Sequence, residues 1–437
     1  MQTGTTRILV LLLGLLVVLA ACVPDEEAAE EALGVDDDID DPVDDPDVDE
    51  EPDDADRTIT IGLLNPVTGP FAALGEDVND GFAFYVEQQG GSLAGYDVEL
   101  VFEDEANDAA IATEAAERMV ERAGADILVG FVNSGVTYAA ASYIVEEGIP
   151  LIITVAGAND LTQRDAADNI FRVSYTSSSD TLPMGTYACE ELGHETVSVV
   201  ALDYAFGWEA AGGFARAYED AGCDVIQETY VPLGTQDWAP FVQEIDRDAD
   251  AVFALIAGPD SIRFVQAYRD FGIEAPLIGG GTLTDEEVLE QMGAIAEGIV
   301  TTLHYSAALD TDENRTFVEA FEDEHGRTVS RYVEGGYASA MILEAALTKI
   351  GGDVSFDAII DALDDVEVDA PRGPIRFDEY GQAVYNIYVR EVQEVDGVWQ
   401  NTVIDTIEDV SQFWTYDAEG YMGFPRYEEL KDTWSSN

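Results

Sequence analysis

Residue types that carry out catalysis or hold metal ions are few in this sequence, and their spacing suits neither task. The chain has three histidines, His194, His304 and His325, and no His-Glu-x-x-His, Cys-x-x-Cys or Gly-x-Ser-x-Gly pattern. His194 and His325 stand beside glycines at predicted helix ends, where we expect solvent-facing caps, whereas His304 could line a cleft. A phosphate-binding Gly-rich loop with Lys-Ser/Thr is also missing. We therefore expect no enzymatic activity, no metal and no cofactor.

Small polar residues stand where a carboxylate could bind instead. Asn133-Ser134-Gly135 directly precedes a predicted helix over 136–147. Free backbone N–H groups at a helix start, together with a serine hydroxyl, suit a carboxylate, although Ser134 could equally be only the N-cap of this helix. Ala156-Gly157-Ala158 is small enough for a ligand to approach the backbone closely. Both loops are candidate ligand contacts.

Aromatic side chains gather on one further loop. Tyr204, Phe206 and Trp208 surround Gly207 between a predicted strand and a predicted helix. One aromatic residue in such a loop usually belongs to the core, but three at the mouth of a cleft favour packing against a ligand. These loops predict binding rather than bond chemistry.

From residue 58 onward, strand and helix patterns alternate in two consecutive series. The strands are continuous apolar runs, as a parallel sheet covered by helices on both faces requires. We expect them at 58–64, 96–102, 126–131 and 150–154, and again at 196–202, 224–230, 251–257 and 276–279. Two such series predict an α/β protein of two doubly wound, Rossmann-like lobes.

The chain is expected to cross between the lobes near 173–178, 299–306 and 368–373, forming a three-stranded hinge. The resulting boundaries are 58–175 plus 304–370 for the N-terminal lobe, 176–303 plus 371–415 for the C-terminal lobe, and 416–437 for a C-terminal tail. Ligands of open α/β sheets bind at the carboxyl ends of strands. The cleft should therefore be lined by loops 65–75, 131–137, 154–160, 203–209, 257–262 and 279–284.

Several short segments resemble, in their order and spacing, the type I periplasmic binding proteins. The resemblance is to the leucine/isoleucine/valine-binding branch of ABC transporter substrate-binding lipoproteins, of a halophilic archaeal type, and spans roughly 58–400. Its carriers are Ile61-Gly62-Leu63-Leu64, Thr68-Gly69-Pro70 with Gly75, Gly130–Ser134, Gly148–Ile152, Asp203–Gly207, and Gly373–Asp378 with Gly381. The resemblance implies a small-molecule ligand, and permease and ATPase subunits of an ABC importer as partners. We also expect a monomer.

The resemblance implies roles for individual residues. Ser134 stands where the family uses a serine, with neighbouring main-chain N–H groups, to hold the ligand carboxylate. Ala156 and Ala158 stand in the loop that supplies a carbonyl and a hydroxyl to the amino acid head group. Phe206 matches an aromatic residue that the second lobe closes over the ligand.

Three departures from the family pattern put the amino acid head group in doubt. Ala158 replaces a threonine or serine, Leu74 replaces a frequent aromatic residue, and Gly281-Thr282 occupies the loop that offers a glutamate to the ligand ammonium. Losing that anion removes a charge-assisted hydrogen bond of ~1.5–3 kcal/mol, about one to two decades of affinity. Asp260, two residues after Gly258, is the candidate replacement.

The charge balance excludes other classes of partner. Acidic side chains number 90 and basic ones 19, and the net charge of −71 repels nucleic acid phosphates and anionic lipid headgroups. Only Lys349 and Lys431 are lysines. Because the Debye length shrinks to ~3 Å near 1 M salt, concentrated salt relieves the self-repulsion of such a chain. We expect an extreme halophile as the source rather than an ordinary acidic secreted protein.

The N-terminus is typical of an exported lipoprotein. Arg7 precedes an apolar run over 8–21, which at ~21 Å is too short to cross a ~30 Å hydrocarbon core. Leu19-Ala20-Ala21-Cys22 resembles a lipobox. We expect a lipoprotein signal peptide over 1–22 and a lipid on Cys22 that anchors the protein at the extracellular face of the cell membrane. A plain signal peptide is the alternative.

Two further features lie outside the predicted cleft. Residues 23–57 are expected to form a disordered acidic linker, because 25–56 contain 19 carboxylates and no aromatic residue. Cys189 and Cys223 lie near the base of one predicted βα layer, where they could form a disulfide or remain two buried free thiols.

The sequence thus predicts an extracytoplasmic, lipid-anchored solute-binding protein of an ABC importer. Its lobes would close on a branched-chain amino acid, or on a similar small amide or carboxylate, without transforming it. A ligand-sensing receptor-type domain with the same cleft is the first alternative, and a hydrolase that uses a cleft carboxylate is the second. Adjacent permease and ATPase genes would favour transport, whereas an adjacent histidine kinase gene would favour sensing.

Overall fold

The computed structural model describes residues 57–436. The predicted signal peptide over 1–22, the lipidation site Cys22 and all of the predicted linker except Arg57 lie outside the described residues.

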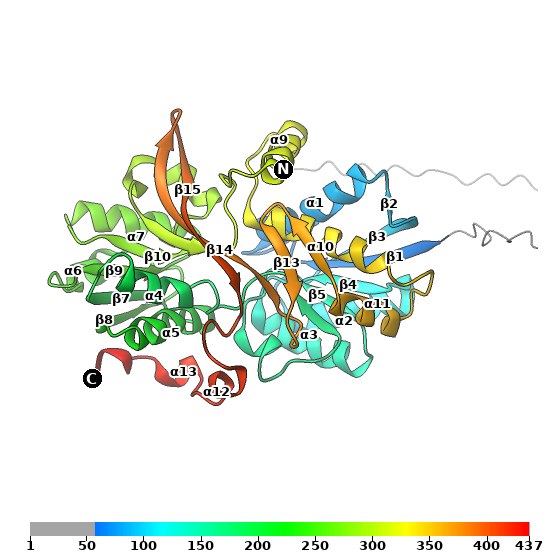
Figure 1. Ribbon diagram of the computed structural model, residues 1–437, viewed down its shortest axis with the longest axis horizontal. Coiled ribbons are helices and arrows are strands. Elements are labelled where there is room, and N and C mark those ends of the chain that lie inside the picture. Colours follow the sequence, from blue (N-terminus) through cyan, green and yellow to red (C-terminus); the bar gives the residue numbers. More distant parts are fainter. Residues whose placement is uncertain (1–56, 437) are drawn as a thin grey trace, which may run out of the picture. The chain divides into compact units, whose positions relative to one another are not determined.

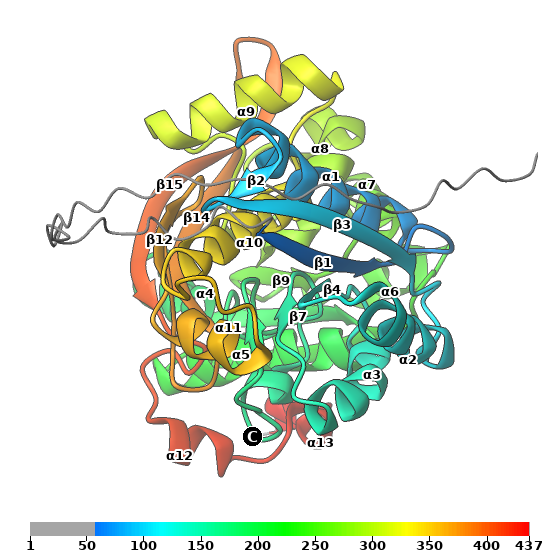
Figure 2. The same cartoon turned by 90° about the vertical axis from the view of Figure 1, so that its right-hand side faces the viewer.

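The first lobe is built on a six-stranded sheet in the order β2-β3-β1-β4-β5-β6. Every neighbouring pair is parallel except β2 and β3. The strands are β1 (Thr58–Asn65), β2 (Ser92–Leu93), β3 (Tyr96–Asp104), β4 (Ile127–Gly130), β5 (Leu151–Ile153) and β6 (Ile170–Arg172). The helices α1 (Ala72–Gln88), α2 (Ala109–Arg118), α3 (Ser134–Glu146), α9 (Asp312–His325), α10 (Arg331–Leu347) and α11 (Phe356–Asp364) accompany it (Figures 1 and 2).

The second sheet follows a longer path of strands, β12-β13-β14-β11-β10-β9-β7-β8, with β15 paired to β14, and its strands β7 to β11 form the second lobe. Strands β7 to β11 run parallel, and the pairs from β11 through β14 to β15 are antiparallel. The strands are β7 (Thr196–Leu202), β8 (Asp224–Val231), β9 (Ala251–Leu255), β10 (Leu277–Gly280), β11 (Val300–Leu303), β12 (Glu367–Ala370), β13 (Gly373–Phe377), β14 (Ala383–Val395) and β15 (Val398–Val410). The helices are α4 (Leu182–Glu190), α5 (Ala205–Asp220), α6 (Ala239–Glu244), α7 (Pro259–Asp270) and α8 (Glu286–Met292), followed by α12 (Ala418–Met422) and α13 (Tyr427–Leu430).

The apolar sequence runs form these strands for the expected reason. Residues of β1, β4 and β5 are buried on both faces, since separate apolar clusters cover the two sides of the first sheet. The eight strands expected from the sequence are all present, with ends shifted by two residues at most. The α/β class and its two doubly wound lobes are therefore confirmed.

Two glycines let the returning helix α10 pack tightly against α1. A Cβ added at Gly81 of α1 would lie 1.9 Å from the carbonyl oxygen of Val333, and one at Gly336 of α10 would lie 2.1 Å from that of Val78. Both distances are far below van der Waals contact, so these positions require glycine. The material expected to return to the first lobe after residue 304 thus does so through α10.

The third crossing between lobes differs from the expectation of 368–373. The side chains of Ile375, Phe377 and Tyr385 belong to the core of the first lobe, whereas Val392 belongs to a core of the second. The chain therefore crosses along β14 itself, which pairs with β13 at its start and with β11 near its end (Figure 1). The Glu379-Tyr380-Gly381 turn marks a hairpin, but nothing local in it specifies which lobe each strand joins.

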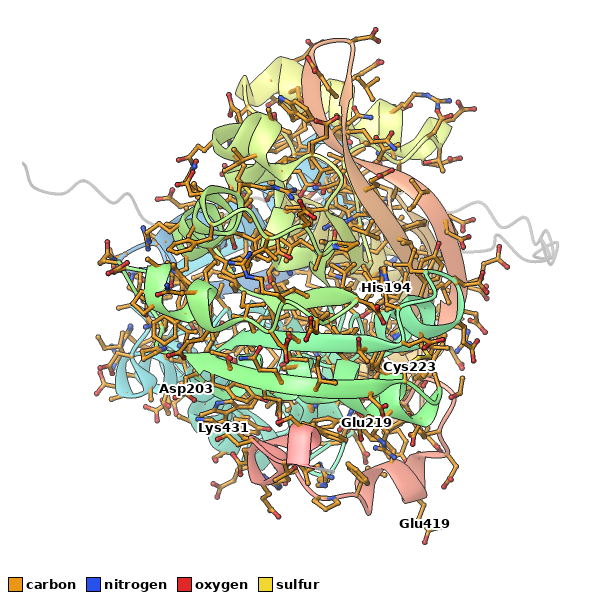
Figure 3. The ribbon with its side chains drawn as sticks, turned by 90° about the vertical axis from the view of Figure 1, so that its left-hand side faces the viewer. His194, Asp203, Glu219, Cys223, Glu419 and Lys431 are labelled. Atoms are coloured by element: carbon orange, nitrogen blue, oxygen red, sulfur yellow. A yellow bond between two sulfur atoms is a disulfide. The ribbon has the colours of Figure 1, made fainter. Side chains whose placement is uncertain are left out.

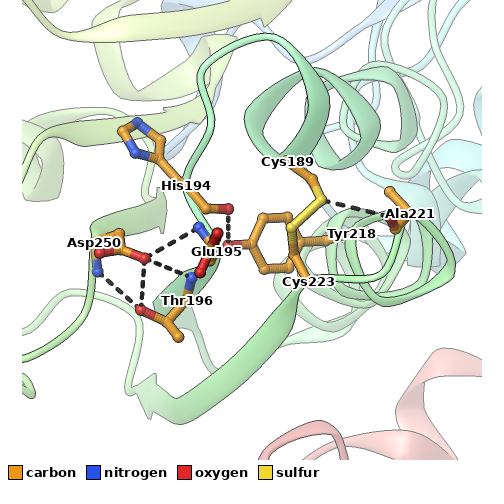
Figure 4. Close-up of a disulfide and its surroundings, with 8 residues drawn as sticks. All are labelled: Cys189, His194, Glu195, Thr196, Tyr218, Ala221, Cys223 and Asp250. Carbon is orange, nitrogen blue, oxygen red and sulfur yellow. Dashed lines mark hydrogen bonds between the residues drawn. A yellow bond between two sulfur atoms is a disulfide. The ribbon is translucent and has the colours of Figure 1, made fainter.

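Cys189 and Cys223 form a disulfide. The Cα atoms of Cys189 and Cys223 are 6.0 Å apart, and the bond joins the end of α4 to the start of β8 (Figure 4). Of the two alternatives open from the sequence, free thiols and a bridge, the structure has the bridge. Nearby, the Tyr218 hydroxyl donates to the backbone carbonyl of His194 at 2.6 Å, and His194 is half-buried rather than fully solvent-facing. His325 is exposed at the end of α9.

Candidate functional site

Two cavities lie among residues that the sequence placed in the cleft. The large cavity, of about 400 Å³, is lined by Ser134 and Ala158 of the first lobe and by Trp208 and Glu209 of α5 in the second. The small cavity, of about 10 Å³, is lined by Phe206, Gly281 and Thr282 together with the crossing segment 175–181. A volume of this size holds about one water molecule, so a solute reaches Phe206 only if the lobes move apart.

Ser134 binds the loop that follows β5 and does not cap its own helix. Helix α3 starts at Ser134, and its N-cap is Asn133, whose side chain accepts from the N–H of Gly135 at 2.8 Å. The Ser134 hydroxyl oxygen instead accepts from the N–H of Ala158 at 3.0 Å. The interpretation of Ser134 as only an N-cap was therefore wrong. A ligand carboxylate at this point would meet a hydroxyl and the start of a helix.

The carbonyl groups of Ala156 and Ala158 face a buried cation. Nη1 of Arg172 donates to the Ala156 carbonyl at 3.1 Å and to the Ala158 carbonyl at 2.7 Å. The same guanidinium donates through Nε to the side-chain oxygen of Gln382 at 2.6 Å and through Nη2 to Thr162. Burial lowers the pKa of Arg172 to about 10, which still leaves it charged near neutral pH. A ligand ammonium approaching these carbonyls would meet this positive charge.

The proposed replacement anion, Asp260, is already neutralised. Its carboxylate accepts from the N–H of Gly234 at 2.8 Å and pairs with Arg263 at 2.5 Å. Neither Asp260 nor the neighbouring Gly258, which has a φ of +59°, lines the large or the small cavity. Thr282 donates its hydroxyl to the Ile256 carbonyl at 3.0 Å. The second lobe thus offers no unpaired acid at these predicted positions.

Leu74 lies apart from both cavities. It packs on α1 beside an apolar cluster that includes Val78, Val132, Val155 and Tyr332. Among the residues predicted to bind ligand, the structure brings Ser134 and Ala158 together, and separately Phe206, Gly281 and Thr282. Leu74, Gly258 and Asp260 are not brought to either group, and Ala156 contributes only its carbonyl to Arg172.

Aromatic rings meet at the crossing segment, where sequence reasoning missed Tyr175. Its ring lies 6.0 Å from that of Phe206 and 5.5 Å from that of His304, centroid to centroid, and Tyr204 lies 6.0 Å from Phe206. His304 is buried and lines neither cavity, and its Nδ1 lies 2.9 Å from a carboxylate oxygen of Asp180. Burial lowers the pKa of His304 to about 4, so its imidazole is neutral near pH 7.

A buried ion pair joins the lobes close to these rings. Nε of Arg331, at the start of α10, lies 3.1 Å from both carboxylate oxygens of Asp285 in the second lobe. Nη2 of Arg331 donates to the Tyr332 hydroxyl at 2.6 Å, and its guanidinium carbon lies 5.0 Å from the Tyr175 ring centroid. No local sequence pattern indicates this pair, because its members are 46 positions apart.

Glu209 gives a second polar contact between the lobes. It stands on α5, three positions after Phe206, and its Oε2 accepts from the N–H of Asn159 in the first lobe at 3.2 Å. Burial raises the pKa of Glu209 to about 7, against the opposing effect of a hydrogen bond from Ser177. The sequence does offer a signal for it, since one helical turn separates it from Phe206.

Other kinds of site find no support within residues 57–436. None of the helices there is long and apolar enough to span a bilayer. The same part of the chain contains no group of three His, Cys, Asp or Glu side chains placed to bind a metal ion.

The comparisons with known proteins agree with this architecture. Residues 58–397 match the periplasmic binding protein family. The chain is 30% identical over 360 residues to Leu/Ile/Val-binding protein homolog 6 of Brucella melitensis, covering 80% of this chain and 92% of that relative. It is also similar to a solved ABC transporter substrate-binding protein from Sphaerobacter thermophilus, with a TM-score of 0.79 and 34% identity over 81% of this chain and 99% of the other.

A further solved structure carries a bound ligand. It is the solute-binding protein of an ABC transporter from Rhodopseudomonas palustris BisB5 in complex with 3,4-dihydroxybenzoic acid. Its TM-score to this chain is 0.76, with 30% identity over 82% of this chain and 99% of the other. Relatives of this chain therefore include proteins named for aliphatic amino acids and one that holds an aromatic acid.

Proposed function

The chain belongs to the periplasmic binding protein family, and on that premise we propose that it is the solute-binding component of an ABC importer, specific for a small carboxylate. The observation that carries the proposal is the pairing of the Ser134 hydroxyl with the Ala158 N–H at the start of α3, next to residues of the second lobe. A carboxylate that binds there would be held by both lobes and would favour their closure. Binding and hinge closure, without bond chemistry, are the whole mechanism.

The carboxylate is proposed to lack an α-ammonium group. Support comes from the acceptors that an ammonium would need, because the carbonyls of Ala156 and Ala158 accept from Arg172 and Asp260 is paired with Arg263. The rings of Tyr175 and Phe206 offer an apolar wall suited to an aromatic or branched aliphatic body. An aromatic carboxylate, as bound by the Rhodopseudomonas palustris relative, is therefore favoured over a branched-chain amino acid.

The cellular setting follows the sequence expectations and is likewise a proposal. A lipid on Cys22 would hold the protein at the outer face of the membrane, and the acidic segment after it would keep the folded unit near the permease. We propose a monomer that works in concentrated salt, given the excess of 71 negative charges.

The ligand class is tested by measuring melting temperature in concentrated KCl with four matched solutes. Leucine is compared with 4-methylpentanoate, which is leucine without its amino group, and benzoate is compared with benzamide, which lacks the charge. A solute at 100 times its Kd stabilises the protein by about 2.7 kcal/mol. We expect 4-methylpentanoate and benzoate to raise the melting temperature more than their partners do. If leucine raised the melting temperature more than 4-methylpentanoate did, the proposal would be contradicted and an amino acid ligand would be favoured.

A further inference from the structure

The chain crosses between the lobes once more after β15. That strand returns to the first lobe, where its last residue, Val410, pairs with Tyr385 and belongs to the same apolar core. Residues 411–436, here named the C-terminal segment, then pass to the second lobe, where α13 lies against α5 (Figure 1). The family match ends at residue 397, so this last crossing lies beyond it.

Aromatic packing and an ion pair attach the C-terminal segment to the second lobe. The guanidinium carbon of Arg216, on α5, lies 4.0 Å from the ring centroids of Tyr416 and Phe424. Further along, Lys431 lies 2.5 Å from the carboxylate of Asp203, and Figure 3 shows the two side chains meeting at the edge of the sheet. The segment is thus fixed to the second lobe at both ends of α5.

Hydrogen bonds and an ion pair hold the same segment to the first lobe. Arg164 donates through Nε to the Met422 carbonyl at 3.0 Å and through Nη2 to the Phe424 carbonyl at 2.8 Å. Arg426 of the segment lies 3.0 Å from one carboxylate oxygen of Asp160, whose other oxygen lies 2.7 Å from Arg164. These contacts of Arg164 and Asp160 with the segment are here named the latch.

The two attachments differ in what their loss would expose. Tyr421 and Tyr427 are buried against the second lobe, with 2% and 6% exposure, so lifting the segment off α5 would bring apolar ring surface into water. The latch consists of polar groups, and water can replace each of its hydrogen bonds. When the lobes separate, the latch should therefore break first, and the segment should stay on the second lobe.

The C-terminal segment also borders the proposed carboxylate site. Phe424 and Tyr427 line the large cavity together with Ser134 and Ala158. Asp160, a member of the latch, stands two positions after Ala158 in the same loop. A ligand bound at Ser134 is therefore bounded by the segment as well as by the two lobes, and the lobes cannot move apart around it while the latch is formed.

We propose that the C-terminal segment is a strap that moves with the second lobe and is latched to the first lobe by Arg164 and Asp160. The latch holds the lobes together over the Ser134 site and slows release of the ligand. This inference rests on the proposed function, since the ligand concerned is the carboxylate bound at Ser134. Because the latch forms only when the lobes are together, it favours that arrangement with or without ligand.

Small-angle X-ray scattering of the intact, ligand-free chain in concentrated KCl tests the strap without relying on any ligand. We expect a larger radius of gyration in Arg164→Met, which removes the latch, and in Lys431→Met, which loosens the strap on the second lobe. Lys431 lines neither cavity, so its effect must pass through the segment. Arg315→Met, at an exposed arginine of α9 paired with Asp310 and Asp312, is the matched control and should scatter like wild type.

Stopped-flow tryptophan fluorescence measures the release of benzoate, because Trp208 lines the site. We expect release about tenfold faster in Arg164→Met, as the loss of hydrogen bonds from a charged group implies, a smaller increase in Lys431→Met and no change in Arg315→Met. Wild-type scattering from both strap variants, or an effect of Arg164→Met alone, would overturn the strap. Larger radii in both variants without any benzoate binding would contradict the proposed ligand class and leave the strap standing.

Discussion

Arg172 and Arg216 are both buried guanidinium groups near the meeting point of the lobes, and their surroundings are opposite. Arg172 has 0% exposure, and its donors are taken by two backbone carbonyls, Gln382 and Thr162. Arg216 has aromatic rings around it and an unpaired Nη1 within the described residues. Arg172 is therefore satisfied by hydrogen bonds to the protein, whereas Arg216 is held mainly by contacts with aromatic rings.

The comparison also explains the departure from amino acid binding. Arg172 donates hydrogen bonds to the loop at 156–158, which the family resemblance assigned to a ligand head group. The Arg172 guanidinium thus fixes the loop through its carbonyls, and Ser134 fixes it through the Ala158 N–H. The same arrangement that orders the site leaves it unsuited to an ammonium.

The largest expected effect is on Arg172. Arg172→Met leaves the carbonyls of Ala156 and Ala158 and the side chain of Gln382 without their donor in a buried region. We expect a loss of about 3–5 kcal/mol in the free energy of unfolding. Urea unfolding in concentrated KCl measures it. A loss below about 1 kcal/mol would contradict the view that Arg172, rather than Arg216, stabilises the fold.

Glu209, which lies near both arginines, is expected to make stability depend on pH. Its carboxyl titrates near 4.5 when unfolded and near 7 when folded, so between these values the folded protein binds more protons than the unfolded chain. Stability contributed by this group is therefore present below pH 4.5 and lost as the pH rises to 7, by about 3 kcal/mol.

Glu209→Gln should remove that slope. Unfolding curves of the variant and wild type at several pH values should converge near pH 4.5 and separate towards pH 7, the variant being the more stable. Parallel curves would show that folding does not raise the pKa of the Glu209 carboxyl, which would contradict this prediction.

Arg216 is expected to matter least for stability. In Arg216→Met the lost cation–π contacts are replaced by an apolar side chain of similar length, so we expect a loss of only about 1–2 kcal/mol without ligand. The same urea experiment used for Arg172 measures it. A loss as large as that of Arg172→Met would erase the distinction between the two arginines.

Much of the fold could be predicted because its signals are local. The apolar run Ile127-Leu128-Val129 has no polar alternation, which predicts a strand buried on both faces, and β4 is one. The crossing along β14 could not be predicted in this way. Nothing in its 13 residues marks a crossing, and only the partners at each end decide which lobe each half joins.

The candidate site was less accessible, because its bonds join distant positions. Ser134 was identified as a ligand contact, but its bond to Ala158 spans 24 positions and its helix is capped by Asn133. Arg331 meets Asp285 only because the chain returns to the first lobe before α10. Asp260 is different, since an arginine three positions later on the same helix predicts that its charge is already paired.

The central claim is that Ser134 and its neighbours hold a small carboxylate between two lobes. Calorimetric titration of wild type and Ser134→Ala with benzoate tests it most directly, with Ser355→Ala, at the exposed N-cap of α11, as the control. We expect saturable binding by wild type and the control, and an affinity about tenfold lower in Ser134→Ala, as the loss of one hydrogen bond to a charged group implies. Equal affinities in all three proteins, or no heat from any of them, would contradict the account.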